Sequence, residues 1–153
     1  HCFTDSRMVR DNYKGTWQVD ETLSFHALND RAFLDRLAAC SGVATTAGFE
    51  TVCEAMYLGK PVLMVPVEGH MEQACNARDF AATGAGIEDR RFRMDRLLDF
   101  IPRYNLSTQQ YQQWVRAAER IIMEQVWSVA GPGTRKDDSV APVISMPEEP
   151  PSK

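Results

Sequence analysis

The segment TTAGFETVCEAMYLGKPVLMVP, residues 45–66, decides the fold of this chain. A turn of small residues leads into a helical pattern whose apolar positions recur every three or four residues. Gly59 ends that pattern, and the proline two residues later prevents its continuation. Residues 62–65 are all apolar, so they cannot alternate between a buried and an exposed face. The segment therefore predicts a turn, a helix and then a strand that is buried on both faces.

The same alternation of strands and helices continues on both sides of this segment, which favours an α/β fold with a parallel sheet covered by helices. Further strands are predicted at residues 1–4, 22–26, 42–45 and 85–87, and further helices from 29 or 30 to about 40, from about 71 to 83, from 94 to 101, and from 107 to near 127. We expect one domain over residues 1–127. Proline, charged and small residues dominate residues 128–153, for which we expect a disordered tail. The strands are few for a complete doubly wound sheet, so we expect at least one strand–helix unit before His1.

The composition of the chain limits which kinds of ligand or partner it can bind. The net charge is −4 and charged residues make up 25% of the chain, so no general positive field exists to attract nucleic acid. The four cysteines lack the close spacing of a metal site or a redox motif. No leader or membrane-spanning pattern is visible. We therefore expect a cytoplasmic protein that binds neither nucleic acid nor a metal ion.

The turn at residues 46–48 is the first candidate binding site. In parallel α/β sheets, ligands bind outside the carboxyl ends of the strands, and this turn follows such an end. The first N–H groups of the next helix lack intrahelical partners and attract anions. Ala47 and Gly48 permit close approach of a ligand, and Thr51 adds a hydroxyl group. We expect Thr46, Ala47, Gly48 and Thr51 to bind a diphosphate.

Carboxylate and amide side chains follow this turn and indicate a ligand that also carries hydroxyl groups. Glu54 lies three residues after Thr51, on the same helix face. It would repel a phosphate but accept hydrogen bonds from the adjacent hydroxyls of a ribose. Glu72 and Gln73 open the next helix, and Asn76 shares a face with Glu72. Such groups suit a sugar, because together they accept and donate hydrogen bonds to hydroxyls.

Each of these residues also has a simpler interpretation. Gly48 can serve only to pack the helix closely against the strand. Glu54 can be an ordinary solvated glutamate. Glu72 and Gln73 can be present simply because polar and acidic side chains at the start of a helix stabilise the positive end of its dipole. We favour the ligand interpretation because Gly48, Thr51 and Glu54 share one face.

The chain resembles the nucleotide-sugar half of a GT-B glycosyltransferase. The resemblance rests on Gly48-x-x-Thr51-x-x-Glu54, then Gly-Lys-Pro, a hydrophobic strand ending in proline, and finally EQACNA at residues 72–77. The pattern is similar to the donor motif of UDP-glycosyltransferases and of the transferase that adds N-acetylglucosamine to the lipid-linked peptidoglycan precursor. It covers residues 23–87 well and the final helices loosely.

The resemblance implies two Rossmann-like domains that face each other across a cleft, of which this chain would be the carboxyl-terminal, donor-binding one. Gly48 and Thr51 would contact the diphosphate of a UDP- or GDP-type sugar nucleotide and Glu54 its ribose. Glu72 and Gln73 would contact the transferred sugar, with Asn76 nearby. No metal and no further cofactor is implied. The catalytic base would come from the amino-terminal, acceptor-binding domain, so we expect this chain alone to be inactive. A lipid-linked acceptor would add peripheral contact with the inner membrane face.

Other functions compatible with this pattern stay open. One is a nucleotide-sugar epimerase, which shares the architecture but needs acid–base groups near the sugar, for which only Glu72 and His70 are candidates. Another is a donor-binding subunit that pairs with a separate acceptor-binding subunit. The third is a scaffold domain without a ligand.

Overall fold

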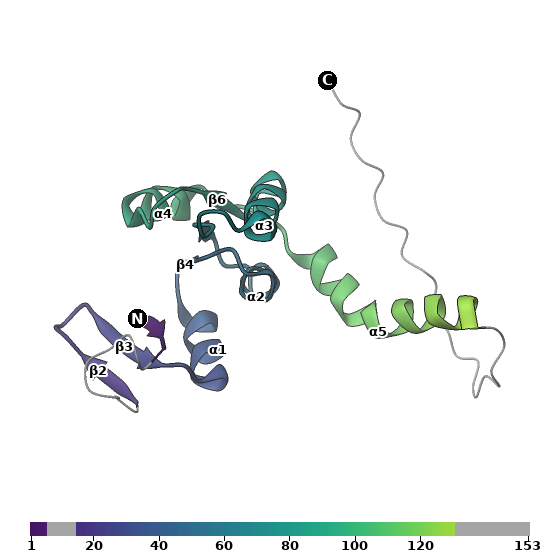
Figure 1. Ribbon diagram of the computed structural model, residues 1–153, viewed down its shortest axis with the longest axis horizontal. Coiled ribbons are helices and arrows are strands. Elements are labelled where there is room, and N and C mark those ends of the chain that lie inside the picture. Colours follow the sequence, from purple (N-terminus) through teal and green to yellow (C-terminus); the bar gives the residue numbers. More distant parts are fainter. Residues whose placement is uncertain (6–14, 131–153) are drawn as a thin grey trace, which may run out of the picture. The chain divides into compact units, whose positions relative to one another are not determined.

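The computed structural model describes residues 1–5 and 15–130 (Figure 1). The chain divides into two compact units, residues 1–108 and residues 109–153. Of the elements within the described residues, the first unit holds every strand and most of the helices. Most of the tail expected at residues 128–153 lies outside the described residues, from residue 131 on.

A parallel sheet forms the centre of the first unit. Its strands are β4 (Val43–Thr45), β5 (Val62–Met64) and β6 (Gly86–Glu88), in the order β4-β5-β6. Every residue of β5 is completely buried, which confirms the strand predicted from four successive apolar residues. A strand buried on both faces requires a layer of helices on each side.

Helices supply both of these layers. On one face, Val62 and Met64 pack in a core with residues of α1 (Asp30–Ala39), α2 (Phe49–Tyr57) and α3 (Met71–Ala82). On the other face, Leu63 and Val65 pack against Leu97 of α4 (Met94–Phe100) and against Ile101, which begins a short 3-10 helix (Ile101–Arg103). The unit is thus an α/β sandwich of the Rossmann-like type, as the sequence predicts.

A second small sheet precedes α1 and differs from the prediction. It has the order β1-β3-β2, with β1 (Cys2–Thr4) parallel and β2 (Thr16–Gln18) antiparallel to β3 (Ser24–Ala27). The prediction contained no strand at β2, and it began the next strand at residue 22. Asp20 explains the later start, because its carboxylate accepts hydrogen bonds from the backbone N–H groups of Thr22 and Leu23 and holds them in a turn.

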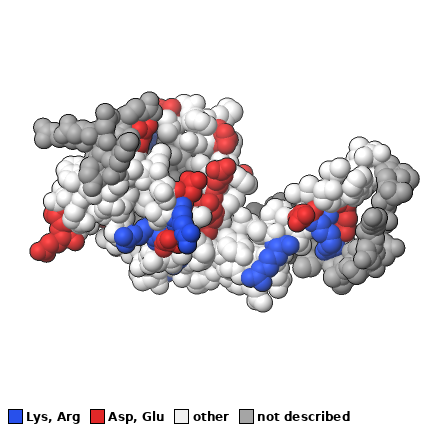
Figure 2. Space-filling model, turned by 90° about the horizontal axis from the view of Figure 1, so that it is seen from below, with Lys and Arg blue, Asp and Glu red and all other residues white. Residues whose placement is uncertain are grey.

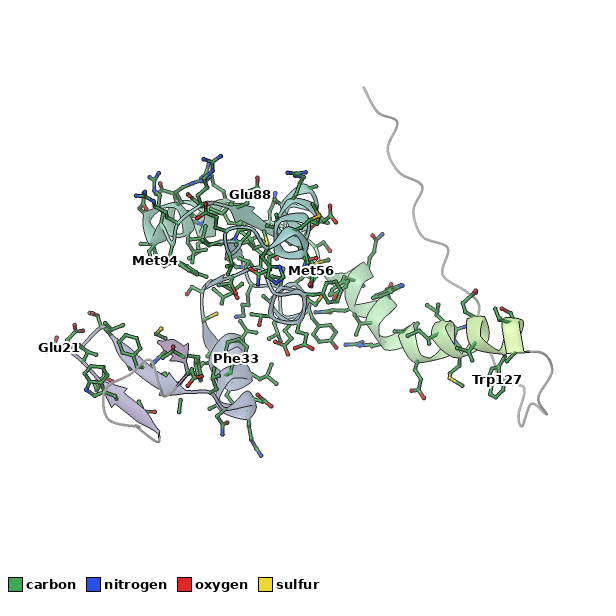
Figure 3. The ribbon with its side chains drawn as sticks, in the orientation of Figure 1. Glu21, Phe33, Met56, Glu88, Met94 and Trp127 are labelled. Atoms are coloured by element: carbon green, nitrogen blue, oxygen red, sulfur yellow. The ribbon has the colours of Figure 1, made fainter. Side chains whose placement is uncertain are left out.

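The second unit contains one described helix, α5 (Gln109–Ala130). It extends past residue 127, where the sequence pattern predicts its end. Trp114 and Trp127 are each 46% exposed (Figure 3 labels Trp127). Among the described residues, no helix has both the length and the apolar character needed to cross a membrane.

Candidate functional site

The turn at residues 46–48 lies at the carboxyl end of β4 and leads directly into α2. Gly48 is the N-cap of α2, with an extended backbone (φ −62°, ψ 138°), and no side chain caps the helix there. A Cβ atom added to Gly48 would meet no described atom within 4 Å. Open space thus lies beside the Cα atom of Gly48, directly before the first N–H groups of α2. This is the geometry expected of an anion site.

Ala47 is the residue of this turn with an unusual backbone conformation. Its φ is +59°, the only positive value among the described residues other than glycine, and its side chain is completely buried. The Nδ2 atom of Asn76, in α3, donates a 3.2 Å hydrogen bond to the carbonyl oxygen of Ala47. Thr46 is exposed. The side chain of Asn76 thus contacts the predicted diphosphate turn at a backbone carbonyl group.

Glu54 and Thr51 are both half-buried on α2. Burial raises the pKa of the Glu54 carboxyl above its usual range, and the negative charges of Glu50 and Asp30 add to this effect. Asp30 is the first residue of α1, three residues after β3 ends. Glu54 therefore lies in the field of the segment that follows β3. The ionised form of the Glu54 side chain is therefore destabilised in the folded protein. Hydrogen-bond donors on a ligand would stabilise it.

The loop between β5 and α3 is held by two side chains. Oε1 of Gln73 accepts a 2.9 Å hydrogen bond from the backbone N–H of Val67. Nδ1 of His70 accepts a 3.4 Å hydrogen bond from the backbone N–H of Gln73, which makes His70 the N-cap of α3. Glu72 is exposed in the first turn of α3. Gln73 thus shapes its own loop, whereas the carboxylate of Glu72 faces solvent.

Sequence reasoning did not identify His70 as a cap. Serine, threonine, aspartate and asparagine are the usual residues at that position, so histidine gives only a weak signal. The two helices of the site, α2 and α3, are in contact, and the rings of Phe49 and Phe80 lie 6.2 Å apart between them. The first residue of α2, directly after the turn, therefore lies close to α3.

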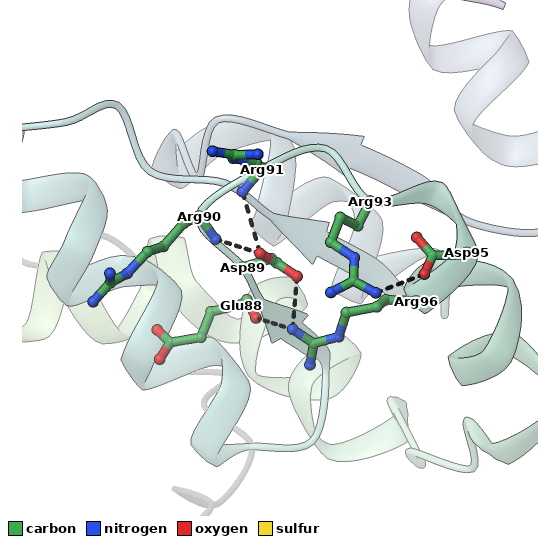
Figure 4. Close-up of polar contacts among 7 residues, drawn as sticks. All are labelled: Glu88, Asp89, Arg90, Arg91, Arg93, Asp95 and Arg96. Carbon is green, nitrogen blue, oxygen red and sulfur yellow. Dashed lines mark hydrogen bonds and ion pairs between the residues drawn. The ribbon is translucent and has the colours of Figure 1, made fainter.

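A third loop, between β6 and α4, lies at the same carboxyl edge of the sheet and is organised by Asp89 (Figure 4). Its carboxylate accepts hydrogen bonds from the backbone N–H groups of Arg90 and Arg91 at 2.6 and 3.2 Å, and from Nη1 of Arg96 at 2.7 Å. These bonds, that of Arg96 first, lower the pKa of the Asp89 carboxyl. Sequence reasoning did not single out this carboxylate.

Figure 2 shows acidic and basic side chains side by side on the visible face, with no broad region of one sign. Over the part of the chain that the structure describes, no three histidine, cysteine, aspartate or glutamate residues lie close enough to hold a metal ion.

Fold and site together define a Rossmann-like half domain with a small-residue turn and an uncapped helix start at the carboxyl edge of its parallel sheet. A family described as "Glycosyl transferase family 1" matches residues 8–105, which is more than half of the chain. The chain therefore belongs to glycosyl transferase family 1. Comparison with curated proteins and with solved structures gives no match.

Proposed function

We propose that this part of the glycosyltransferase binds the sugar-nucleotide donor, of the UDP or GDP type. The diphosphate binds at the turn 46–48 and at the first N–H groups of α2, with the hydroxyl of Thr51 beside it. Glu54 accepts hydrogen bonds from the ribose hydroxyls. Glu72 and the free amide nitrogen of Gln73 contact the transferred sugar. An acceptor-binding domain, on the same chain or in a separate subunit, supplies the catalytic base.

The observation that supports this proposal most is the open space at Gly48, at the start of an uncapped helix. The uncapped N–H groups and the helix dipole attract a diphosphate without a metal ion, and each charge gains about 0.3–1 kcal/mol when exposed. The raised pKa shows that the ionised Glu54 carboxylate is poorly stabilised by its surroundings, which fits a residue that accepts hydrogen bonds from the hydroxyl groups of a ligand. Membership of glycosyl transferase family 1 supports the proposal that this site serves the transfer of a sugar from an activated donor.

Gly48→Ala tests the proposal. The φ of −62° suits alanine, and the added methyl group has no described neighbour within 4 Å, so the fold should persist. The methyl group would occupy the space that the diphosphate needs. We expect at least a tenfold loss of affinity for whichever of UDP and GDP binds the wild-type protein more tightly, measured by calorimetry.

Ala82→Ser is the matched control, because it adds one atom at an exposed position near the end of α3. It should leave the affinity unchanged. Unchanged binding by Gly48→Ala would remove the turn from the site. A wild-type protein that binds neither nucleotide would contradict donor binding by this part of the chain.

A further inference from the structure

We propose that Asn76 is a positioning residue, which holds the diphosphate turn in its binding conformation through the backbone of Ala47. The family resemblance places Asn76 near the transferred sugar, whereas its geometry points to this different role. The inference rests on the proposed function of the turn at residues 46–48.

The backbone of Ala47 needs support from its surroundings. A φ of +59° lies in the left-handed region, where the Cβ atom of an L-residue crowds the following carbonyl oxygen. The buried side chain of Ala47 anchors one side of this residue. The hydrogen bond from Asn76 anchors the other side, at the carbonyl oxygen. Two independent contacts therefore fix a conformation that alanine rarely adopts.

Fixing this carbonyl also orients the next N–H group. In a trans peptide, the C=O of one residue and the N–H of the next point in opposite directions within one plane. The C=O of Ala47 points to Asn76 in α3, so the N–H of Gly48 points away from Asn76. Gly48 is the N-cap residue, and its Cα faces open space. Asn76 thus sets the direction of an amide at the entrance to the anion site.

The contact requires a hydrogen-bond donor on the side chain of residue 76. A carbonyl oxygen accepts hydrogen bonds only, so the NH₂ group of Asn76 must face Ala47. Aspartate has the same shape but would place a carboxylate oxygen against the carbonyl oxygen. Asn76→Asp therefore reverses the interaction at constant size, and Asn76→Ala removes it. Ala47→Gly removes the need for support, because glycine adopts positive φ without strain.

The test measures Asn76→Asp and Asn76→Ala, each with and without Ala47→Gly, by calorimetry with UDP and UDP-glucose and with GDP and GDP-mannose. A positioning role predicts that each Asn76 variant loses about tenfold in affinity for the nucleoside diphosphate and for its sugar nucleotide alike. Ala47→Gly should restore most of the loss caused by Asn76→Ala. It should restore little of the loss caused by Asn76→Asp, because the carboxylate still repels the carbonyl oxygen of residue 47. Cys75→Ala, an exposed neighbour on α3, is the control and should bind as the wild type does.

A loss confined to the sugar nucleotides would overturn the proposal, because it would place Asn76 on the sugar. A second measurement needs no ligand: the free energy of unfolding of wild type, Asn76→Ala, Ala47→Gly and the double variant. The proposal predicts that Asn76→Ala costs less stability when residue 47 is glycine, and strictly additive effects would overturn it. Coupling in a protein that binds no nucleotide would support the Asn76–Ala47 link and contradict the proposed function alone.

Discussion

The Nζ atom of Lys60 donates a 2.9 Å hydrogen bond to the carbonyl oxygen of Cys40, the residue that caps the carboxyl end of α1. Lys60 is half-buried and lies between α2 and β5. Its cation therefore meets the negative end of the α1 dipole and satisfies one of the unpaired carbonyl groups there. The lysine of the Gly-Lys-Pro sequence thus connects the end of α1 to the segment between α2 and β5.

Lys60→Met should lower the free energy of unfolding by about 1–2 kcal/mol, because it removes a hydrogen bond from a charged donor and leaves the carbonyl unpaired. Urea unfolding measures the change. Arg31→Met, at an exposed cation of α1, is the control and should cost less than about 0.5 kcal/mol. Equal effects of the two substitutions would contradict a specific role for the lysine.

Gly59→Ala should destabilise the protein by about 1–2 kcal/mol through backbone strain alone. The φ of Gly59 is +68°, and an added Cβ atom would lie 3.9 Å from Cγ2 of Thr108, an ordinary contact. Gly59→Asn separates strain from crowding, because asparagine is larger but tolerates positive φ better than alanine does. If Gly59→Asn proves more destabilising than Gly59→Ala, crowding rather than φ decides this position.

The central sheet was predictable because its signals are local. Four apolar residues in a row cannot lie in a half-exposed strand, and the structure places Val62 and Met64 in one core and Leu63 and Val65 in the other. Gly59 ends α2 for an equally local reason, its positive φ. Such signals need no knowledge of distant contacts.

Strand β2 gave no comparable signal. It is three residues long and exposed throughout, so it has no alternation of apolar and polar residues. Its pairing with β3 is supported by the stacked rings of Trp17 and Phe25, whose centroids lie 5.6 Å apart. This contact joins residues eight positions apart across a turn, which a short-range pattern does not reveal.

The chemistry proposed for the site comes from the sequence, whereas its geometry comes from the structure. The sequence indicates an anion site at the turn and places Asn76 beside it. Nothing in the sequence shows that Ala47 has a positive φ, because alanine rarely adopts one. The link from Asn76 to a backbone carbonyl 29 residues earlier likewise depends on how α3 packs.

Asp89→Asn should lower the melting temperature at pH 7, because it removes the negative charge that faces Arg96 and two backbone N–H groups. The pKa of Asp89 is lowered in the folded protein, so the stability that it contributes is present above the unfolded pKa of about 3.9 and is lost as the pH falls further. The difference between variant and wild type should therefore shrink at pH 3. Asp99→Asn, at an exposed residue of α4, is the control. A difference that persists unchanged at pH 3 would argue against the charge as its cause.

His26 should cause the stability of the protein to fall as the pH drops from 6.5 to 5. Burial lowers the pKa of its imidazole, and the nearby cation of Arg36 adds to the effect. The unfolded chain, with an ordinary pKa of about 6.5, therefore binds a proton before the folded chain does, and stability falls as the pH drops. Melting temperatures across this range measure the slope.

His26→Asn should flatten that slope, because asparagine does not titrate. Thr16 Oγ1 and Ser24 Oγ lie 2.9 and 3.1 Å from the two ring nitrogens of His26, so the variant will also lose stability at pH 7.5. The slope, rather than the absolute melting temperature, is the quantity to compare. An unchanged slope would assign the acid sensitivity to another group.

Glu54→Gln should change stability and binding in opposite directions. The pKa of Glu54 is raised by burial and by the charges of Glu50 and Asp30, so the ionised form destabilises the folded protein at neutral pH. That penalty is present above the folded pKa and disappears as the pH falls to the unfolded pKa of about 4.3. Glu54→Gln should therefore raise the melting temperature at pH 7 and leave it unchanged near pH 4.

The same substitution should weaken nucleotide binding by about 1–3 kcal/mol, since it replaces a charged acceptor of ribose hydroxyls by a neutral one. Calorimetry with UDP and GDP measures this loss. Asp35→Asn also removes a negative charge, but at an exposed position of α1 outside the proposed site, so it should leave the affinity unchanged. A carboxylate that is kept at a cost in stability and improves binding is typical of a functional residue. If Glu54→Gln stabilises the protein without weakening binding, Glu54 has no contact with the nucleotide.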